Sequence, residues 1–206
     1  DAIARAADSY FGTKNYARAM SYYDRLISSG AQSQDYALFQ RGSIQGLQGN
    51  SQAKIATLNS VVQKFPNSNY ADDVAFEIPY TYFLLDQYDQ AITGLQKMVE
   101  QYPRSSYVPR ALVTIGLVQY NQDNRDAALA TFQRVVSQYP TTDEAKQSLA
   151  SIENIYLDKN DASGYIRYAT STNIGDLSKA EQDGHTFAVA RTLFDRGNWQ
   201  GAVEAV

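Results

Sequence analysis

The segment Tyr70–Pro140 contains one sequence pattern twice. The second copy reads Leu112-x-x-Ile115-Gly116, then Ala128-x-x-x-Phe132-x-x-Val135, and closes with Tyr139-Pro140. A step of 37 residues towards the N-terminus gives Ala75-x-x-Ile78-Pro79, Ala91-x-x-x-Leu95-x-x-Met98 and Tyr102-Pro103. Apolar residues at three- and four-residue spacing indicate amphipathic helices. Each copy therefore predicts a pair of helices, and a pair of this size must stack on its neighbours to bury its apolar face.

The same step extends the pattern towards both ends of the chain. In the second copy, Arg41 and Lys54 stand where an apolar and a small residue are expected. In the fifth copy, Tyr165 takes the small-residue position, which predicts a short trailing helix at about 162–169, followed by a polar linker at 171–176. The predicted hairpins cover residues 1–30, 32–66, 69–103, 106–140, 142–170 and 177–206.

Local signals mark where these helices begin and end. Asparagine side chains can accept hydrogen bonds from the free amides of a first helical turn, and we expect such caps at Asn50, Asn124 and Asn198. Thr141-x-x-Glu144 is typical of a capping box. Proline disfavours helical geometry in the residue before it, so we expect three trailing helices to end ahead of Pro66, Pro103 and Pro140.

Small residues recur where the two helices of a hairpin must approach closely. They are Ala7, Gly42, Gly116 and Ala190 in the leading helices, and Ala19, Ala91 and Ala128 in the trailing ones. Pro79 replaces the small residue in the third copy. Its ring removes a helical hydrogen bond and crowds the carbonyl of Ala75, which predicts a kink. A further hypothesis is that the kink shapes a binding site around Phe76, Tyr80 and Phe83.

Composition excludes several classes of function. A formal charge of −4 and a pI near 5.0 argue against a general grip on nucleic acid, which needs clustered Lys and Arg, and slightly favour a basic partner. The chain has no cysteine, which excludes disulfides, zinc–thiolate sites and thiol catalysis. No run of 18 apolar residues occurs, so we expect no membrane span.

Motifs for catalysis and for cofactor binding are missing from the sequence. There is no phosphate-binding glycine loop, nucleophile elbow or zinc-protease helix, and His185 is the sole histidine. The stretch 158–164 resembles a calcium loop, but its glycine is misplaced and no Glu closes it. Asp72 and Asp73 start a helix, where their charge favourably opposes the helix dipole. We therefore expect a protein that is not an enzyme and has no cofactor or metal.

The repeated pattern resembles the tetratricopeptide repeat family, whose signature combines a Leu-Gly-like pair, an Ala-x-x-x-Phe step and a closing Pro. The resemblance implies an all-α fold, a right-handed α-α superhelix of about five to six stacked hairpins. Three segments are similar to bacterial envelope members: Phe65-Pro-Asn-Ser-Asn-Tyr-Ala-Asp-Asp73, Tyr102-Pro-Arg-Ser-Ser-Tyr107 and Tyr139-Pro-Thr-Thr-Asp143. These include the periplasmic coordinator of the Tol-Pal system and the lipoprotein of the outer-membrane barrel assembly machinery. A periplasmic or outer-membrane-associated adaptor is implied.

In this family the leading helices line the concave surface, where partner proteins or peptides commonly lie. Carried over by register, the resemblance implies partner-binding residues at Tyr36, Phe39, Asp73, Phe76, Tyr80, Phe83, Arg110, Val113, Leu117, Tyr120, Phe187, Arg191 and Phe194. Aromatic and Arg side chains are frequent anchors of interfaces. The alternative for any one of them is packing against the neighbouring hairpin.

The sequence therefore predicts a non-enzymatic scaffold or adaptor of the bacterial cell envelope. Two alternatives stay open. The first is a self-assembling repeat module, a homo-oligomer joined through the C-terminal helix, where Trp199, Val203 and Val206 would be exposed; a chain that is an excerpt of a longer protein explains that helix as well. The second is the targeting region of a larger enzyme whose catalytic domain lies beyond Val206.

Overall fold

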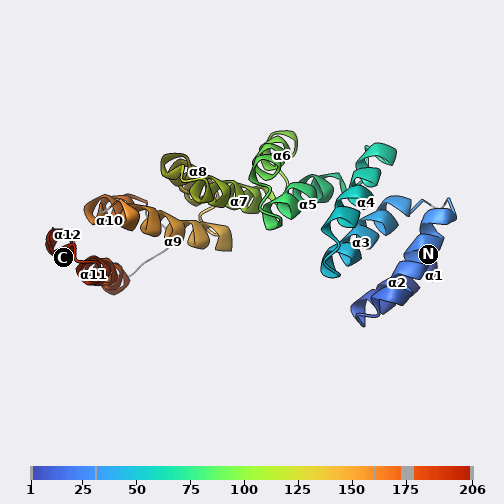
Figure 1. The fold of residues 1–206 in the computed structure, drawn as a ribbon, viewed down its shortest axis with the longest axis horizontal. Helices are drawn as coiled ribbons and strands as arrows, with labels where there is room; N and C mark the ends of the chain where they lie inside the picture. Colours follow the sequence, from blue (N-terminus) through green and yellow to red (C-terminus); the bar gives the residue numbers. More distant parts are fainter. Residues whose placement is uncertain (1, 31, 160, 173–178, 205–206) are drawn as a thin grey trace. The chain divides into compact units, whose positions relative to one another are not determined.

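A computed structural model describes residues 2–30, 32–159, 161–172 and 179–204. Within those ranges every regular element is an α-helix, which confirms the predicted fold class (Figure 1). None of the described helices is long and apolar enough to cross a membrane. The chain divides into two compact units, Asp1–Val108 and Pro109–Val206. Most of the predicted linker at 171–176, the side chain of His185 and all of Val206 lie outside the description.

The first unit consists of three helical hairpins. Within each hairpin the two helices contact one another, and each trailing helix also contacts the leading helix that follows it, so that α2 contacts α3 and α4 contacts α5. The helices are α1 (Ala2–Gly12), α2 (Tyr16–Ser28), α3 (Gln34–Leu47), α4 (Ser51–Lys64), α5 (Ala71–Leu84) and α6 (Tyr88–Gln101). The helices α3 and α5, and likewise α4 and α6, start 37 residues apart as the repeat predicts, whereas α2 and α4 start 35 residues apart.

The second unit continues the same order of leading and trailing helices. Contacts join α8 to α9, α9 to α10, and α11 to α12, and α10 also touches α11 and α12. The helices are α7 (Val108–Asn121), α8 (Arg125–Gln138), α9 (Asp143–Asp158), α10 (Ala162–Ser171), α11 (Lys179–Asp195) and α12 (Trp199–Glu204). The ten residues of α10 confirm the predicted short helix. A single array through the whole chain stays a prediction.

Helix boundaries follow the local signals with one correction. The predicted asparagines accept hydrogen bonds from backbone amides three residues later, at 3.1, 3.4 and 3.0 Å for Asn50, Asn124 and Asn198. The capping box at Thr141-x-x-Glu144 is wrong by one residue. The turn after Tyr139 places Thr142 directly before α9, and its Oγ1 accepts from the amide of Ala145 at 3.2 Å.

The prolines end the trailing helices as predicted. Helices α4, α6 and α8 end at Lys64, Gln101 and Gln138, in each case two residues before a proline. The residue between helix end and proline has a φ of −133°, −126° and −132° in the three hairpins, respectively. These values lie outside the helical range, as expected for a residue that precedes proline.

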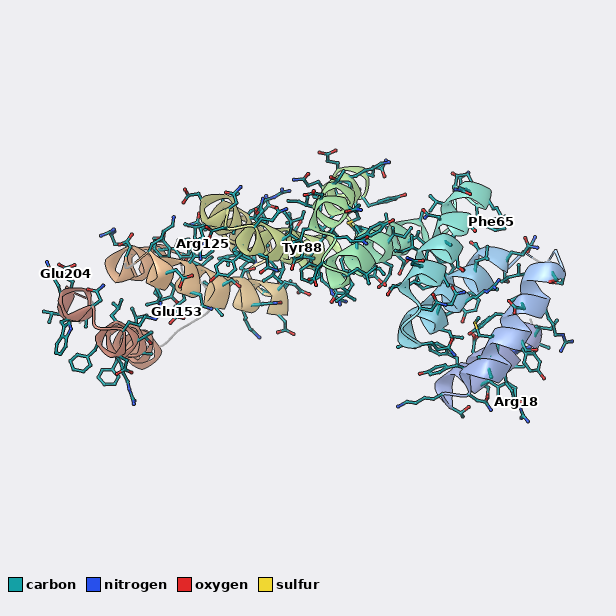
Figure 2. The ribbon with its side chains drawn as sticks, in the orientation of Figure 1. Arg18, Phe65, Tyr88, Arg125, Glu153 and Glu204 are labelled. Carbon is teal, nitrogen blue, oxygen red and sulfur yellow. The ribbon has the colours of Figure 1, made fainter. Side chains whose placement is uncertain are left out.

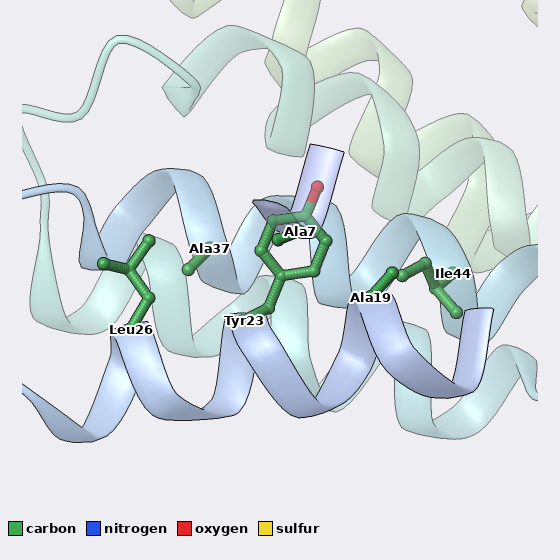
Figure 3. Packing of buried hydrophobic residues seen from close by; sticks show 6 residues of the cluster. All are labelled: Ala7, Ala19, Tyr23, Leu26, Ala37 and Ile44. Atoms are coloured by element: carbon green, nitrogen blue, oxygen red, sulfur yellow. The ribbon is translucent and has the colours of Figure 1, made fainter. Parts of the chain in front are cut away.

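The hydrophobic core lies between the helices of each hairpin and between neighbouring hairpins. At the first junction the fully buried residues are Ala7, Ala19, Tyr23, Leu26, Ala37 and Ile44, contributed by α1, α2 and α3 (Figure 3). The aliphatic residues surround the ring of Tyr23, whose hydroxyl points towards α1. Burial of this size contributes about 25 cal/mol for each Å² of apolar surface removed from water.

The small residues stand where helices approach closely. A Cβ added to Gly42 would lie 2.8 Å from Leu58 Cδ2, and one added to Gly116 would lie 2.6 Å from Phe132 Cε1. At the third hairpin the buried ring of Pro79 faces Gly94 of α6, where an added Cβ would lie 2.6 Å from the proline Cβ. Gly94 of the trailing helix therefore leaves room for the ring of Pro79. Helix α5 stays helical on both sides of this proline. The kink stays a prediction.

Lys54, the unexpected residue in the second hairpin, connects two hairpins. Its ammonium group lies 2.5 Å from the Glu77 carboxylate of α5, and only 12 % of its side chain is exposed. Gly46 of α3 leaves room for the lysine stem, because an added Cβ there would lie 2.9 Å from Lys54 Cδ. A charged residue is tolerated at this position because a carboxylate of the next hairpin pairs with it.

Candidate functional site

A connected row of aromatic and acidic residues lies along the leading helices of the first unit and the turns that enter them. All its members are partly exposed, and ring contacts or hydrogen bonds link most of them to one another. We call this row the leading-helix strip, and its residues are Asp8, Tyr36, Phe39, Tyr70, Asp73, Tyr80, Phe83 and Tyr107.

Ring contacts hold the strip in place. Tyr70, in the turn before α5, lies with its ring centroid 5.1 Å from Phe39 and 5.7 Å from Tyr36. One repeat later, Tyr107 stacks on Phe76 with the centroids 4.8 Å apart. The two stacked pairs share an interplanar angle of 16°. Each aromatic pair is worth about 0.5–1.5 kcal/mol beyond its buried area, so the rings are fixed before any partner arrives.

The serine of each Pro-x-Ser-x-Tyr segment joins consecutive hairpins. Ser68 donates a hydrogen bond of 2.7 Å to Asp35, and Ser105 donates one of 2.7 Å to Asp72. Each serine hydroxyl also accepts from the amide of the tyrosine two residues later. Sequence reasoning missed this junction, although the two serines and the two aspartates each recur at the 37-residue step.

Carboxylates of the strip are bound by neutral donors. Asp8 Oδ1 accepts from the hydroxyls of Tyr23 at 2.7 Å and Tyr36 at 2.6 Å, and Asp73 Oδ1 accepts from Tyr107 at 2.8 Å. Among the described residues no Lys or Arg forms an ion pair with Asp8, Asp35 or Asp73. The strip therefore combines aromatic rings with negative charge that no cation of the described chain neutralises.

The tyrosine pKa values report this negative field. Burial raises the pKa of Tyr70, and the charges of Asp35, Asp73 and Asp8 raise it further. Burial, followed by a hydrogen bond to a carboxylate, raises the pKa of Tyr36 and of Tyr107 to about 12 in each case. These hydroxyls therefore stay protonated and act as hydrogen-bond donors near neutral pH.

Asp73 gives a testable pH dependence. Burial raises its pKa, although the hydrogen bond from Tyr107 opposes the shift. A raised folded-state pKa means that this carboxyl group's contribution to stability is present below its unfolded pKa and is lost as pH rises through the folded one. Asparagine stays neutral and can still accept from Tyr107. We expect Asp73→Asn to melt at a higher temperature than the native chain near neutral pH, at about pH 7.

The difference should shrink at about pH 3, below the ordinary pKa of aspartate, because both side chains are then neutral. Thermal unfolding followed by circular dichroism at the two pH values measures it. A melting temperature that falls at neutral pH would show that the ionised carboxylate makes the better hydrogen bond and that burial is the weaker effect.

The residues predicted to contact a partner fall into three environments. Two of them are buried: Phe76, which is 0 % exposed and lies between Tyr80 and Tyr107, and Val113, which is 3 % exposed. Neither side chain offers a surface to a partner. Members of the strip are Tyr36, Phe39, Asp73, Tyr80 and Phe83. Those in the second unit with some exposure are Arg110, Leu117, Tyr120, Phe187, Arg191 and Phe194.

In the second unit the predicted residues do not form one strip. Tyr120 donates a hydrogen bond of 2.7 Å to Asp158, and the Arg125 guanidinium lies over its ring at 5.2 Å from the centroid. Phe187, Arg191 and Phe194 lie instead along an apolar cleft of about 660 Å³ on α11 and α12. We call it the terminal cleft, and its other lining residues are Ala190, Trp199, Ala202 and Val203.

The sequence matches the tetratricopeptide repeat family over residues 1–29, 36–68, 80–105 and 110–142, more than half of its length. The chain belongs to the tetratricopeptide repeat family. Membership confirms the predicted family and supports a role in protein–protein interaction, the usual work of these repeats. No curated protein matches the sequence.

Several solved tetratricopeptide repeat structures share the fold at low sequence identity. A protein from Parabacteroides merdae is 12 % identical with a TM-score of 0.69, and the match covers 98 % of this chain and 75 % of that one. MamA from Desulfovibrio magneticus is 15 % identical with a TM-score of 0.66, covering 82 % and 90 %. YrrB, described as having an unusual peptide-binding site, is 16 % identical with a TM-score of 0.61, covering 89 % of each chain.

Proposed function

We propose that this tetratricopeptide repeat chain is a non-enzymatic adaptor of the bacterial cell envelope that holds a partner segment along the leading-helix strip. The observation that carries the proposal is the strip itself, where partly exposed aromatic rings are held in place by stacking and by hydrogen bonds to carboxylates. Fixed aromatic side chains lose little conformational entropy when a partner binds, so they make effective anchors. The peptide-binding site named for YrrB supports the same kind of use.

The charge of the strip selects the kind of partner. The strip carboxylates Asp8 and Asp73, and Asp35 beside Tyr36, form no ion pair with a Lys or Arg of the described chain. Lys and Arg side chains bind carboxylates and also lie favourably over tyrosine rings. We therefore propose an extended partner segment with basic residues. The envelope setting rests on the aromatic-Pro-x-Ser-x-Tyr segments, which are similar to those of envelope members of the family.

A matched pair of peptides tests the strip. Fluorescence anisotropy would compare two labelled peptides of equal length and apolar content, one with lysines and one with glutamates at alternate positions. We expect saturable binding of the lysine peptide alone, weakened by added salt because the charges are partly exposed. The double variant Asp8→Asn/Asp73→Asn keeps both hydrogen-bond acceptors and removes both charges, so we expect it to bind at least about tenfold more weakly.

Replacing Asp143, which is 93 % exposed on α9, by asparagine serves as the control, because it removes one charge outside the strip. Equal binding of the two peptides, or a double variant that binds like the native chain, would rule out the charge-selective strip. The envelope setting is tested separately, by fractionating cells that express the full reading frame and locating the protein with an antibody.

A further inference from the structure

The terminal cleft exposes an unusual amount of apolar surface. Its residues Phe187, Phe194, Trp199 and Val203 are 65, 55, 66 and 78 % exposed, and Figure 2 shows aromatic rings projecting from α11 and α12. Phe194 and Trp199 touch, with ring centroids 5.2 Å apart. Contiguous apolar patches on soluble proteins commonly mark a surface that another segment covers.

The repeat register shows what covers the equivalent surface elsewhere in the chain. Phe187 follows Phe76 by 111 residues, three repeats of 37, and Phe76 follows Phe39 by one repeat. In both earlier hairpins a tyrosine from the next hairpin stacks on the phenylalanine, Tyr70 on Phe39 and Tyr107 on Phe76. Phe187 is the third phenylalanine at this position, and it is 65 % exposed, with no ring contact to it among the described residues.

At both junctions, a serine precedes the stacking tyrosine by two residues and also contacts the preceding hairpin. Two residues before the tyrosine, Ser68 or Ser105 donates to an aspartate that stands four residues before the phenylalanine, Asp35 or Asp72. At both junctions, therefore, the aspartate of an Asp-x-x-x-Phe pattern accepts the hydrogen bond of the serine, and its phenylalanine stacks on the tyrosine, of a Ser-x-Tyr segment in the next hairpin. The sequence of the last leading helix repeats the receiving pattern as Asp183-x-x-x-Phe187.

At the matching positions of the 37-residue repeat, Asp-x-x-x-Phe and Ser-x-Tyr either both occur or are both absent. The intervening leading helices have other residues at the receiving positions, Pro109 with Val113 and Lys146 with Ala150. The segments one repeat further on also have other residues, Thr142 with Glu144 and Lys179 with Glu181. Asp-x-x-x-Phe occurs three times in this chain. Two copies, at Asp35 and Asp72, have a Ser-x-Tyr segment in the next hairpin, and the third copy ends at Phe187.

We propose that the terminal cleft accepts one further helical hairpin of this repeat's own kind, whose entry carries Ser-x-Tyr and stacks its tyrosine ring on Phe187. The leading helix of that hairpin would cover Phe194, Trp199 and Val203, as α5 packs against α4. A second copy of the described chain does not supply this entry, because both of its Pro-x-Ser-x-Tyr segments, which are the ones that enter a leading helix in this way, already bind Asp35 and Asp72. The inference does not depend on the proposed function of the strip.

Trp199 makes the proposal measurable, since it is the only tryptophan of the chain and lines the cleft. The probe is a synthetic peptide with the sequence of residues 65–84, which contains Ser68, Tyr70 and the α5 helix. We expect it to shift the Trp199 emission to shorter wavelength in a saturable manner. A peptide with Ser68→Ala and Tyr70→Ala should bind at least about tenfold more weakly.

The chain variant Phe187→Ala should bind the native peptide about tenfold more weakly. Circular dichroism should show that this variant is folded, because Phe187 is mostly exposed. Leu84→Ala, at a leucine that is 61 % exposed and lies outside the cleft, is the matched control and should bind like the native chain. No emission shift, or equal binding of the two peptides, would overturn the proposal. Light scattering that shows a dimer, with Trp199 emission that depends on chain concentration, would also overturn it by assigning the cleft to a second copy.

Discussion

Replacing Gly116 by leucine is expected to destabilise the second unit by roughly 2–3 kcal/mol, in the upper range for overpacking a close helix contact. Even the first added atom is too close, because a Cβ at this position would lie 2.6 Å from Phe132 Cε1 and 2.8 Å from its Cζ. The phenylalanine ring is 0 % exposed, so it has no open space to move into. The helices α7 and α8 would have to separate, and both would lose buried contacts.

Urea unfolding followed by circular dichroism and by Trp199 fluorescence measures this change. Gly12→Ala is the control, because nothing lies within 4 Å of an added Cβ there, and we expect a change within about 0.5 kcal/mol. Phe132→Leu should partly rescue Gly116→Leu, since the third hairpin pairs Pro79 with Leu95 at the same two positions. An unfolding curve that Gly116→Leu leaves unchanged would contradict the helix contact and the repeat register that predicts it.

The hairpins could be predicted from the sequence because the signals for them are local and repeated. Apolar spacing identifies the inner face of each helix, asparagine caps and prolines mark the ends, and the recurrence at 37 residues checks one hairpin against the next. The capping box failed by one residue because Thr141 and Thr142 offer the same hydroxyl, and only the turn after Tyr139 determines which one precedes α9.

The candidate site was less predictable because its contacts join residues that are distant in sequence. The family resemblance placed Phe76 among the outward, partner-binding positions of its leading helix, but Phe76 is 0 % exposed. Its burial depends on Tyr107, 31 residues later, which folds back over it from the turn before α7. Likewise Asp8 gave no signal in the sequence, yet it accepts hydrogen bonds from tyrosines 15 and 28 residues away. Apolar spacing predicts which face of a single helix is buried. The contacts of Phe76 and Asp8 depend instead on how neighbouring helices and hairpins pack against one another.

Asp8→Ala is expected to cost about 2–3 kcal/mol of stability in the first unit, since it removes the acceptor of two tyrosine hydroxyls. Tyr23 lies in the first core (Figure 3) and is 0 % exposed. Its hydroxyl lies 2.7 Å from its acceptor, Asp8 Oδ1. Without that carboxylate the buried hydroxyl keeps its desolvation cost and loses its bond. Asp8→Asn retains an acceptor oxygen and should lose less than half as much stability.

A double-mutant cycle separates this effect from a simple loss of side-chain volume. If the unsatisfied hydroxyl is the cause, Asp8→Ala should cost much less in a chain that already carries Tyr23→Phe, with a coupling of about 1–2 kcal/mol. Additive effects in denaturant unfolding would show that the hydrogen bond contributes little and that helix packing alone holds Tyr23. Because Tyr36 donates to the same carboxylate oxygen, a strong coupling would also mean that the core of the first hairpin positions one end of the leading-helix strip. A substitution inside that core should then weaken partner binding without touching the partner.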